Sequence, residues 1–205
     1  MPHAPVLPHC RLMLILPPAI SADDASAWVK AGDVAAVIVP LPAGPEAQAI
    51  ATLRALAEVV QEAGAAFLVE DRVDLAAAIK ADGVHVDSLD ALARALPAVK
   101  PDGIAGAGLP TRHDAMEAGE AGADYILFGK TDGSDDIAPT VALVDWWAEV
   151  FEVPCVGVAT TLAEAEALAA AGADFIALAR LPAGADGAAL IQSVDRHIAT
   201  LEGRA

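Results

Sequence analysis

Short runs of branched apolar residues alternate along this chain with longer stretches whose apolar residues recur at helical spacing. Short apolar runs are typical of strands that are buried on both faces. The stretches with helical spacing are typical of helices that cover such strands. Leu53, Leu56, Ala57 and Val60 form one helical stripe. The pattern predicts strands near residues 11–17, 34–40, 65–70, 83–87, 103–107, 124–129, 153–158 and 174–179.

A helix is predicted after each of these strands, with Asp23 and Ser88 as candidate N-caps. A phrase close to Ala-Gly-Asp recurs before every second strand, at Asp33, Asp82, Asp124 and Asp174. Glycine there favours the end of a helix, since it tolerates the left-handed conformation. The predicted helices lie near residues 22–31, 45–63, 72–81, 88–97, 112–121, 140–151, 162–171 and 184–201.

Eight consecutive strand–helix units with no second pattern predict an α/β protein with a single (β/α)8 TIM barrel. We assign residues 11–205 to the barrel and the proline-containing stretch 1–10 to an N-terminal arm. The repeated aspartates precede their strands and so fall at the end of the barrel opposite the chemistry. They are expected to hold the fold together.

The chain has 12 basic and 29 acidic residues, a net charge of −17. This balance argues against nucleic acid or an anionic membrane surface as a partner, because binding phosphates needs clustered Lys and Arg. No apolar run reaches the roughly 18 residues of a membrane span. Cys10 and Cys155 have no metal-binding or redox spacing. We therefore expect a cytoplasmic protein with a small-molecule ligand.

Active sites of such barrels form where the strands end and the following loops begin. Charged side chains gather at four of these ends, whereas the first two ends carry prolines and apolar residues. The polar or small candidates for binding a ligand or phosphate are Glu70, Arg72, Asp87, Gly108, Thr131, Thr160 and Arg180.

Two side chains are candidates for catalysis. His85 alternates with Val84 and Val86 and so points into the barrel, either to contact a ligand or as a hydrogen-bonded core histidine. Lys130 follows the sixth strand, where it either reacts with or holds a ligand, or pairs with Asp132 or Asp135 on the rim.

Several segments resemble the thiamine phosphate synthases, a family that includes the TenI-type thiazole tautomerases. Residues 69–76 and 81–86 are similar to the family's third- and fourth-strand signature. Residues 122–129 and 171–174 resemble its sixth and eighth strands. The resemblance extends over about residues 11–200 and implies the same barrel fold.

The resemblance also implies a reaction in which an aminopyrimidine pyrophosphate is joined to a thiazole phosphate. Ionisation of the pyrimidine expels pyrophosphate, which Mg²⁺ and basic and hydroxyl groups hold. The family's two metal-binding carboxylates fall on Asp71 and Asp90. The structural alternative is that Asp71 caps one helix and Asp90 lies in the first turn of the next.

Other positions depart from the family pattern. Glu70 replaces an asparagine, Gly108 a serine, and Pro110 the histidine of the TenI type, while the turn after strand seven contains Thr160. The residues expected to bind pyrophosphate are replaced by Ile38, Pro40 and Pro42.

The acidic mouth repels a pyrophosphate unless metal ions, Lys130 or Arg180 compensate. We therefore expect a diverged member that binds a small phosphorylated or heterocyclic ligand with altered or lost catalysis. The alternatives are an active thiamine phosphate synthase, and a non-catalytic scaffold that forms homo-oligomers through Trp146 and Trp147.

Overall fold

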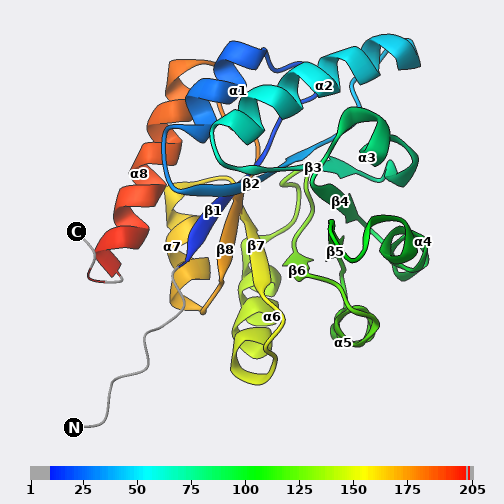
Figure 1. Ribbon diagram of the computed structural model, residues 1–205. Helices are drawn as coiled ribbons and strands as arrows, with labels where there is room; N and C mark the ends of the chain where they lie inside the picture. The colour runs from blue at the N-terminus through cyan, green and yellow to red at the C-terminus, as the bar shows by residue number, and fades with distance from the viewer. Residues whose placement is uncertain (1–9, 202, 204–205) are drawn as a thin grey trace, which may run out of the picture.

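The computed structural model describes residues 10–201 and Gly203, which form alternating strands and helices (Figure 1). The strands are β1 (Arg11–Ile15), β2 (Val34–Val39), β3 (Ala66–Glu70), β4 (Gly83–Val86), β5 (Ile104–Gly108), β6 (Tyr125–Phe128), β7 (Cys155–Ala159) and β8 (Phe175–Leu178). The helices are α1 (Ala22–Val29), α2 (Glu46–Glu62), α3 (Val73–Ile79), α4 (Leu89–Val99), α5 (Arg112–Ala121), α6 (Ile137–Val150), α7 (Leu162–Ala170) and α8 (Ala185–Leu201).

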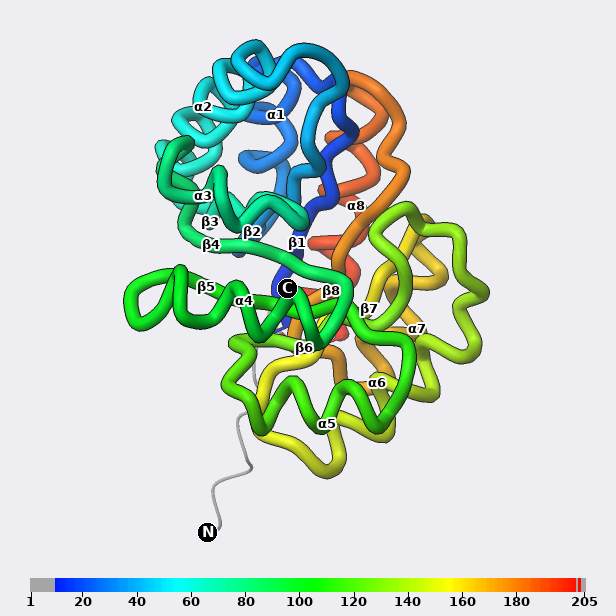
Figure 2. The backbone as a smooth tube through the Cα atoms, turned by 90° about the vertical axis from the view of Figure 1, so that its right-hand side faces the viewer, coloured from blue at the N-terminus to red at the C-terminus, as the bar shows by residue number. Residues whose placement is uncertain are grey.

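Each strand pairs in parallel with the next, and β8 pairs with β1, so the sheet closes into a barrel. Figure 2 shows α1 to α3 on one side of the strands and α5 to α7 on the other. Helix α8 packs against α1 and α7, which completes the outer layer. The predicted (β/α)8 barrel is confirmed. The predicted arm over residues 1–10 lies outside the described residues except for Cys10, which is buried.

The predicted element bounds agree with the structure to within a few residues. Helix α6 begins three residues earlier than expected because the Asp136 side chain accepts a hydrogen bond from the Ala138 amide and caps the helix. Ser88 caps α4 as predicted. The prediction for Asp23 is wrong: Ser21 caps α1, accepting from the Asp24 amide, and Asp23 lies in the first turn.

The core has two layers. Large apolar side chains fill the space between strands and helices, among them Trp28, Phe67 and Trp147. A second cluster fills the lumen with side chains that include Met13, Ile38, Leu68, Tyr125 and Val156. Successive side chains along a strand point alternately to the lumen and to the helices, so each strand contributes to both layers.

Strand β5 gives the lumen no side-chain volume at Gly106. A Cβ atom at Gly106 would lie 1.9 Å from Cζ of Tyr125, so the tyrosine ring occupies the space that this glycine leaves. His85 stands beside it, its ring parallel to that of Tyr125 at 5.7 Å between centroids. The lumen between β4, β5 and β6 is therefore polar at its centre.

Three of the repeated aspartates accept from the amide of the first or second residue of the preceding strand. Asp82 Oδ2 accepts from the Phe67 amide at 2.7 Å, Asp124 Oδ2 from the Ala105 amide at 2.7 Å, and Asp174 Oδ2 from the Cys155 amide at 2.8 Å. Each aspartate thus ties its own strand to the preceding one at the amino-terminal end. The expected structural role of these residues is confirmed.

The first copy of the phrase uses a different contact. Asp33 Oδ1 accepts from the Arg11 guanidinium, at 2.9 Å from Nε and 2.8 Å from the terminal nitrogen. The Asp33 amide donates to Asp195 of α8 at 3.0 Å. This copy therefore links β1, β2 and the last helix.

The two tryptophans of α6 face different environments. Trp147 is buried, and its Nε1 donates to the Val153 carbonyl at 2.7 Å. Trp146 is half-buried, with the Arg112 guanidinium 4.7 Å above its ring. A homo-oligomer through this face remains a prediction. Within the described part of the chain, no helix is both long and apolar enough to cross a membrane.

We expect Asp174→Ala to lower the free energy of unfolding by about 1–2 kcal/mol, because the Cys155 amide loses its acceptor. Asp174→Asn retains an oxygen and should lose less. Urea denaturation of both variants measures the difference. Glu149→Ala, at an exposed position of α6, is the control and should stay within about 0.5 kcal/mol of the parent. An Asp174→Ala variant as stable as this control contradicts the structural role.

Candidate active site

A cavity of about 380 Å³ opens at the carboxyl ends of β3 to β6. A second compartment, of about 320 Å³, lies beside it at the ends of β1, β2 and β8 and is lined largely by apolar side chains and prolines. The larger cavity has a markedly acidic lining. Its residues are Glu70, Asp71, His85, Asp87, Gly108, Leu109, Pro110, Leu127, Gly129, Lys130, Thr131, Asp132 and Asp135.

A hydrogen bond across the mouth separates the two compartments. The Thr131 hydroxyl, in the loop after β6, donates to Glu70 Oε1 at the end of β3, at 2.6 Å. Both residues line both compartments. Burial raises the pKa of Glu70, the Thr131 hydroxyl partly offsets this, and the nearby charges of Asp71, Asp87 and Asp132 raise it further.

His85 and Tyr125 form a hydrogen-bonded pair at the floor of the larger cavity. His85 Nδ1 lies 2.9 Å from the Tyr125 hydroxyl. His85 is only 2% exposed, and burial lowers the pKa of its imidazole to about 4. Burial, with the charges of Glu70 and Asp124, raises the pKa of Tyr125. Both side chains are therefore neutral at physiological pH. Of the two alternatives expected for His85, the structure shows the hydrogen-bonded core histidine, which also lines the cavity.

Asp71 joins the ends of β3 and β4. Its amide donates to the His85 carbonyl at 2.8 Å, and its carboxylate accepts from the backbone of Asp87. Its φ of +52° is a left-handed conformation that Asp and Asn tolerate better than most residues. Burial, and then the charge of Asp87, raise the pKa of Asp71. Two neighbouring carboxylates on the cavity wall suit a hard cation that keeps most of its waters.

The second predicted metal ligand lies elsewhere. Asp90 is exposed and does not line the cavity. It lies in the first turn of α4, as the structural alternative to a metal ligand predicted. Among the described residues there is no group of three or more His, Cys, Asp or Glu side chains arranged to hold a metal ion. Asp71 with Asp87 is therefore a better candidate pair than Asp71 with Asp90.

Arg72 does not line the cavity. Its guanidinium binds Asp74 and Glu46, both at 2.7 Å, and thereby links α3 to the start of α2. We predicted a ligand-binding arginine at this position, but the structure commits the side chain to two carboxylates. The remaining basic candidates stand on the rim.

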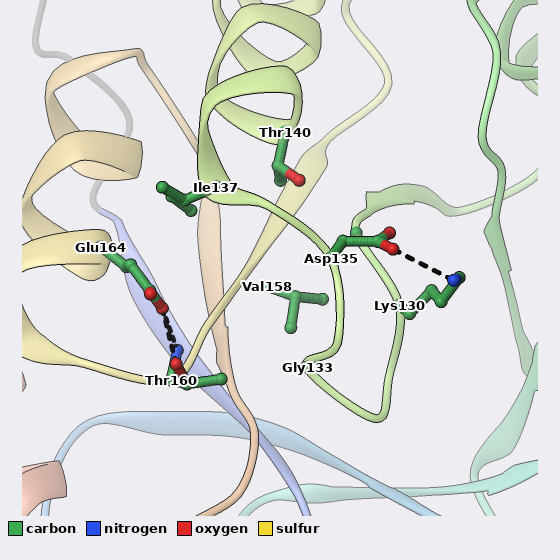
Figure 3. Close-up of a pocket in the computed structure, with 9 residues that line it drawn as sticks. Lys130, Gly133, Asp135, Ile137, Thr140, Val158, Thr160 and Glu164 are labelled. Carbon is green, nitrogen blue, oxygen red and sulfur yellow. Dashed lines mark hydrogen bonds and ion pairs between the residues drawn. The ribbon is translucent and has the colours of Figure 1, made fainter.

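Figure 3 shows the loop that carries Lys130 and its ion pair with Asp135, at 3.2 Å. This is the rim pairing that the sequence offered as one alternative. Arg180, with a left-handed φ of +53°, donates through Nε to the Asp132 carbonyl at 2.7 Å and lines the apolar compartment. The two cations therefore border different compartments.

Thr160 is bound by the carboxylate of Glu164, a residue of α7. Glu164 Oε2 accepts from the Thr160 amide at 2.6 Å and from its hydroxyl at 2.8 Å (Figure 3). Thr161 caps α7 by accepting from the Glu164 amide. The polar groups predicted to bind phosphate at this turn are thus engaged by the protein itself. Gly108, in contrast, does line the larger cavity.

Sequence reasoning missed two residues of this region. Tyr125 was assigned only to a buried strand, although its alternation with Leu127 places it in the lumen. Glu164 was placed only within the predicted helix 162–171, although Thr161 and Glu164 have the Thr-x-x-Glu spacing of a capping box. The signal for Tyr125 becomes clear once the strand register is known. The signal for Glu164 is the spacing at the start of α7.

A closed barrel whose polar side chains converge at the carboxyl ends of its strands belongs to the class of barrels that bind ligands at that face. The family model described as thiamine monophosphate synthase matches residues 12–181. The chain therefore belongs to this family, as the resemblance of its strand signatures predicted.

Individual relatives agree with this assignment. The thiamine-phosphate synthase of Rhodospirillum centenum is 40% identical over 180 residues, covering 82% of this chain and 87% of that protein. That of Hyphomonas neptunium is 37% identical over 196 residues, covering 83% and 85%. The solved structure of a thiamine phosphate pyrophosphorylase from Pyrococcus furiosus has a TM-score of 0.78 at 22% identity, covering 96% of this chain and 98% of that one.

The buried neutral histidine makes stability depend on pH. In the unfolded chain the His85 pKa returns to its ordinary value of 6.5, whereas in the folded protein it is about 4. Between these values only the unfolded chain binds the proton. The contribution of His85 to the free energy of unfolding therefore falls as the pH drops from 6.5 towards 4, by up to about 3 kcal/mol.

His85→Gln removes this titration, so its unfolding free energy should fall less than that of the parent over the same pH interval. His113→Gln, at an exposed histidine of α5, is the matched control and should keep the parental slope. Equal slopes for the parent and His85→Gln contradict a neutral buried imidazole.

Proposed function

We propose that this protein is an active thiamine-phosphate synthase that joins an aminopyrimidine pyrophosphate to a thiazole phosphate and releases pyrophosphate. The observation that carries the proposal is the similarity, over most of both chains, to proteins that bear this name. The cavity at the carboxyl ends of the strands, with its pair of neighbouring carboxylates, supports it. This favours the alternative over the diverged protein that the acidic mouth led us to expect.

The acidic lining has a role in such a reaction. The bond between the pyrimidine methylene carbon and the pyrophosphate oxygen breaks, its electron pair leaves with pyrophosphate, and positive charge develops on the pyrimidine. Carboxylates such as Glu70 and Asp87 stabilise that positive charge. The thiazole nitrogen then supplies the electron pair of the new carbon–nitrogen bond. The carboxylate charges that repel the pyrophosphate leaving group thus stabilise the positive charge on the pyrimidine ring.

The departing pyrophosphate needs positive charge as well. Lys130 is 66% exposed on the rim and can exchange Asp135 for an anion, since exposed ion pairs are weak. Mg²⁺ fits Asp71 and its neighbour Asp87, because carboxylate oxygens are the ligands that this ion prefers. When bound, Mg²⁺ supplies charge neutralisation of the leaving group.

A second candidate function is binding of a heterocyclic ligand with altered or lost catalysis. The excess of carboxylates over lysine in the cavity favours it, and so does the engagement of Thr160 by Glu164. In that case the aminopyrimidine would bind while the pyrophosphate would not react.

We expect the protein to convert the two substrates into thiamine phosphate and pyrophosphate in the presence of Mg²⁺. Asp71→Asn keeps the left-handed backbone but removes the charge, and should lower kcat/KM by about 10²–10³-fold. Asp145→Asn, on the exposed face of α6, is the control and should retain the parental rate.

Thiamine phosphate measured by chromatography decides between the candidates. Stabilisation of the protein against heat by the aminopyrimidine, with no product formed, favours the second function over the first. A parental rate in Asp71→Asn contradicts the role given to this carboxylate.

A further inference from the structure

One imidazole nitrogen at the floor of the cavity has no hydrogen-bond partner among the described residues. Among the described residues, the only hydrogen bond of the His85 side chain joins Nδ1 and the Tyr125 hydroxyl, and Nε2 has no partner. No side-chain nitrogen or oxygen of that part of the chain is both sealed from solvent and unpartnered. Nε2 is therefore open to the cavity, which His85 lines.

The hydrogen bond to Tyr125 determines which ring nitrogen carries the proton. The buried Tyr125 hydroxyl has a single proton and, among the described residues, a single partner, His85 Nδ1. Leaving that proton without an acceptor would cost the full desolvation of the group. Tyr125 therefore donates to Nδ1, and the proton of the neutral imidazole lies on Nε2. The nitrogen that faces the cavity is a donor.

Gly108 keeps the approach to this donor open. A Cβ atom at residue 108 would lie 3.1 Å from Nε2 and 3.4 Å from Cε1 of His85. Leu109 and Leu127 provide apolar walls beside it. The position thus offers one neutral donor in a largely apolar slot, which suits the nitrogen of an aromatic ring.

The surrounding carboxylates supply the complementary pattern. Glu70, Asp71 and Asp87 line the same cavity and are acceptors when ionised. An aminopyrimidine presents a ring nitrogen that accepts and, on the neighbouring carbon, an amino group that donates. Phosphate oxygens, in contrast, would meet repulsion from all three carboxylates.

We propose that His85 is a binding residue for the pyrimidine substrate, donating from Nε2 to a ring nitrogen, and that Tyr125 is a positioning residue that holds the proton on Nε2. The inference rests on the proposed function for the identity of the ring. Glu70, Asp71 or Asp87 accepts from the exocyclic amino group. Gly108 is required because a side chain there would occupy the place of the ring.

The test uses 4-amino-5-hydroxymethyl-2-methylpyrimidine, an uncharged probe without pyrophosphate, and the full-length protein. Calorimetry should show binding that His85→Leu weakens about tenfold, the loss of one well-placed hydrogen bond. Gly108→Ala should weaken it at least as much. His85→Gln, which retains a terminal N–H, should recover part of the affinity. His113→Gln is the matched control on the surface and should bind as the parent does.

Nitrogen NMR of the parent protein gives a readout that does not depend on the folding of any variant. The His85 imidazole should be protonated at Nε2 and unprotonated at Nδ1, and the Nε2 resonance should shift on adding the probe. In Tyr125→Phe both tautomers should be populated. A change in tautomer is not expected of a tyrosine that merely fills the lumen.

Three results overturn the inference: an Nδ1-protonated imidazole in the parent, unchanged binding in His85→Leu, or no binding of the probe to the parent. Formation of thiamine phosphate is measured separately. Product formed at the parental rate by His85→Leu refutes the inference and leaves the proposed function intact. Probe binding through His85 without product refutes the proposed function and leaves the inference intact.

Discussion

The barrel is held at its amino-terminal end by carboxylates that bind strand amides. Asp82, Asp124 and Asp174 each precede an even-numbered strand and accept from the amide of the first or second residue of the odd-numbered strand before it. Neighbouring parallel strands are connected through a helix, so no tight turn fixes their register, and a contact of this kind can fix it instead. The Arg11–Asp33 pair serves the seam between β1 and β2. Three of the four copies of the internal repeat thus make the same contact.

The same contact leaves the opposite end of the strands free for polar chemistry. With the register fixed at the amino-terminal end, β3 and the loop after β6 bring Glu70 Oε1 and the Thr131 hydroxyl to 2.6 Å from each other across the mouth. Gly106 and Gly108 of β5 make room for Tyr125 and for a ligand beside His85. Small residues on β5 therefore leave space for the Tyr125 ring and, beside His85, for the cavity at the carboxyl ends of the strands.

Much of the fold could be predicted from the sequence. The eight units, most element bounds and the role of the repeated aspartates follow from hydrophobic period and from where glycine ends a helix. The charged mouth was also predictable, because strand ends meet at one face. Individual contacts were not. Arg72 faces Glu46 and Asp74, Asp90 lies outside the cavity, and Thr160 is bound by Glu164, since side-chain direction at a loop depends on the following helix.

Tyr125 illustrates the same limit within the core. Its position on a strand was clear, but its pairing with His85 depends on the register of β4, β5 and β6 together. That pairing is what makes the neutral histidine a donor to the cavity.

A crystal structure of the protein with thiamine phosphate tests the central claim most directly. We predict that the pyrimidine lies in the larger cavity, with a ring nitrogen within hydrogen-bond distance of His85 Nε2 and the amino group facing Glu70, Asp71 or Asp87. A pyrimidine bound in the compartment beside Arg180, or away from His85, would contradict it.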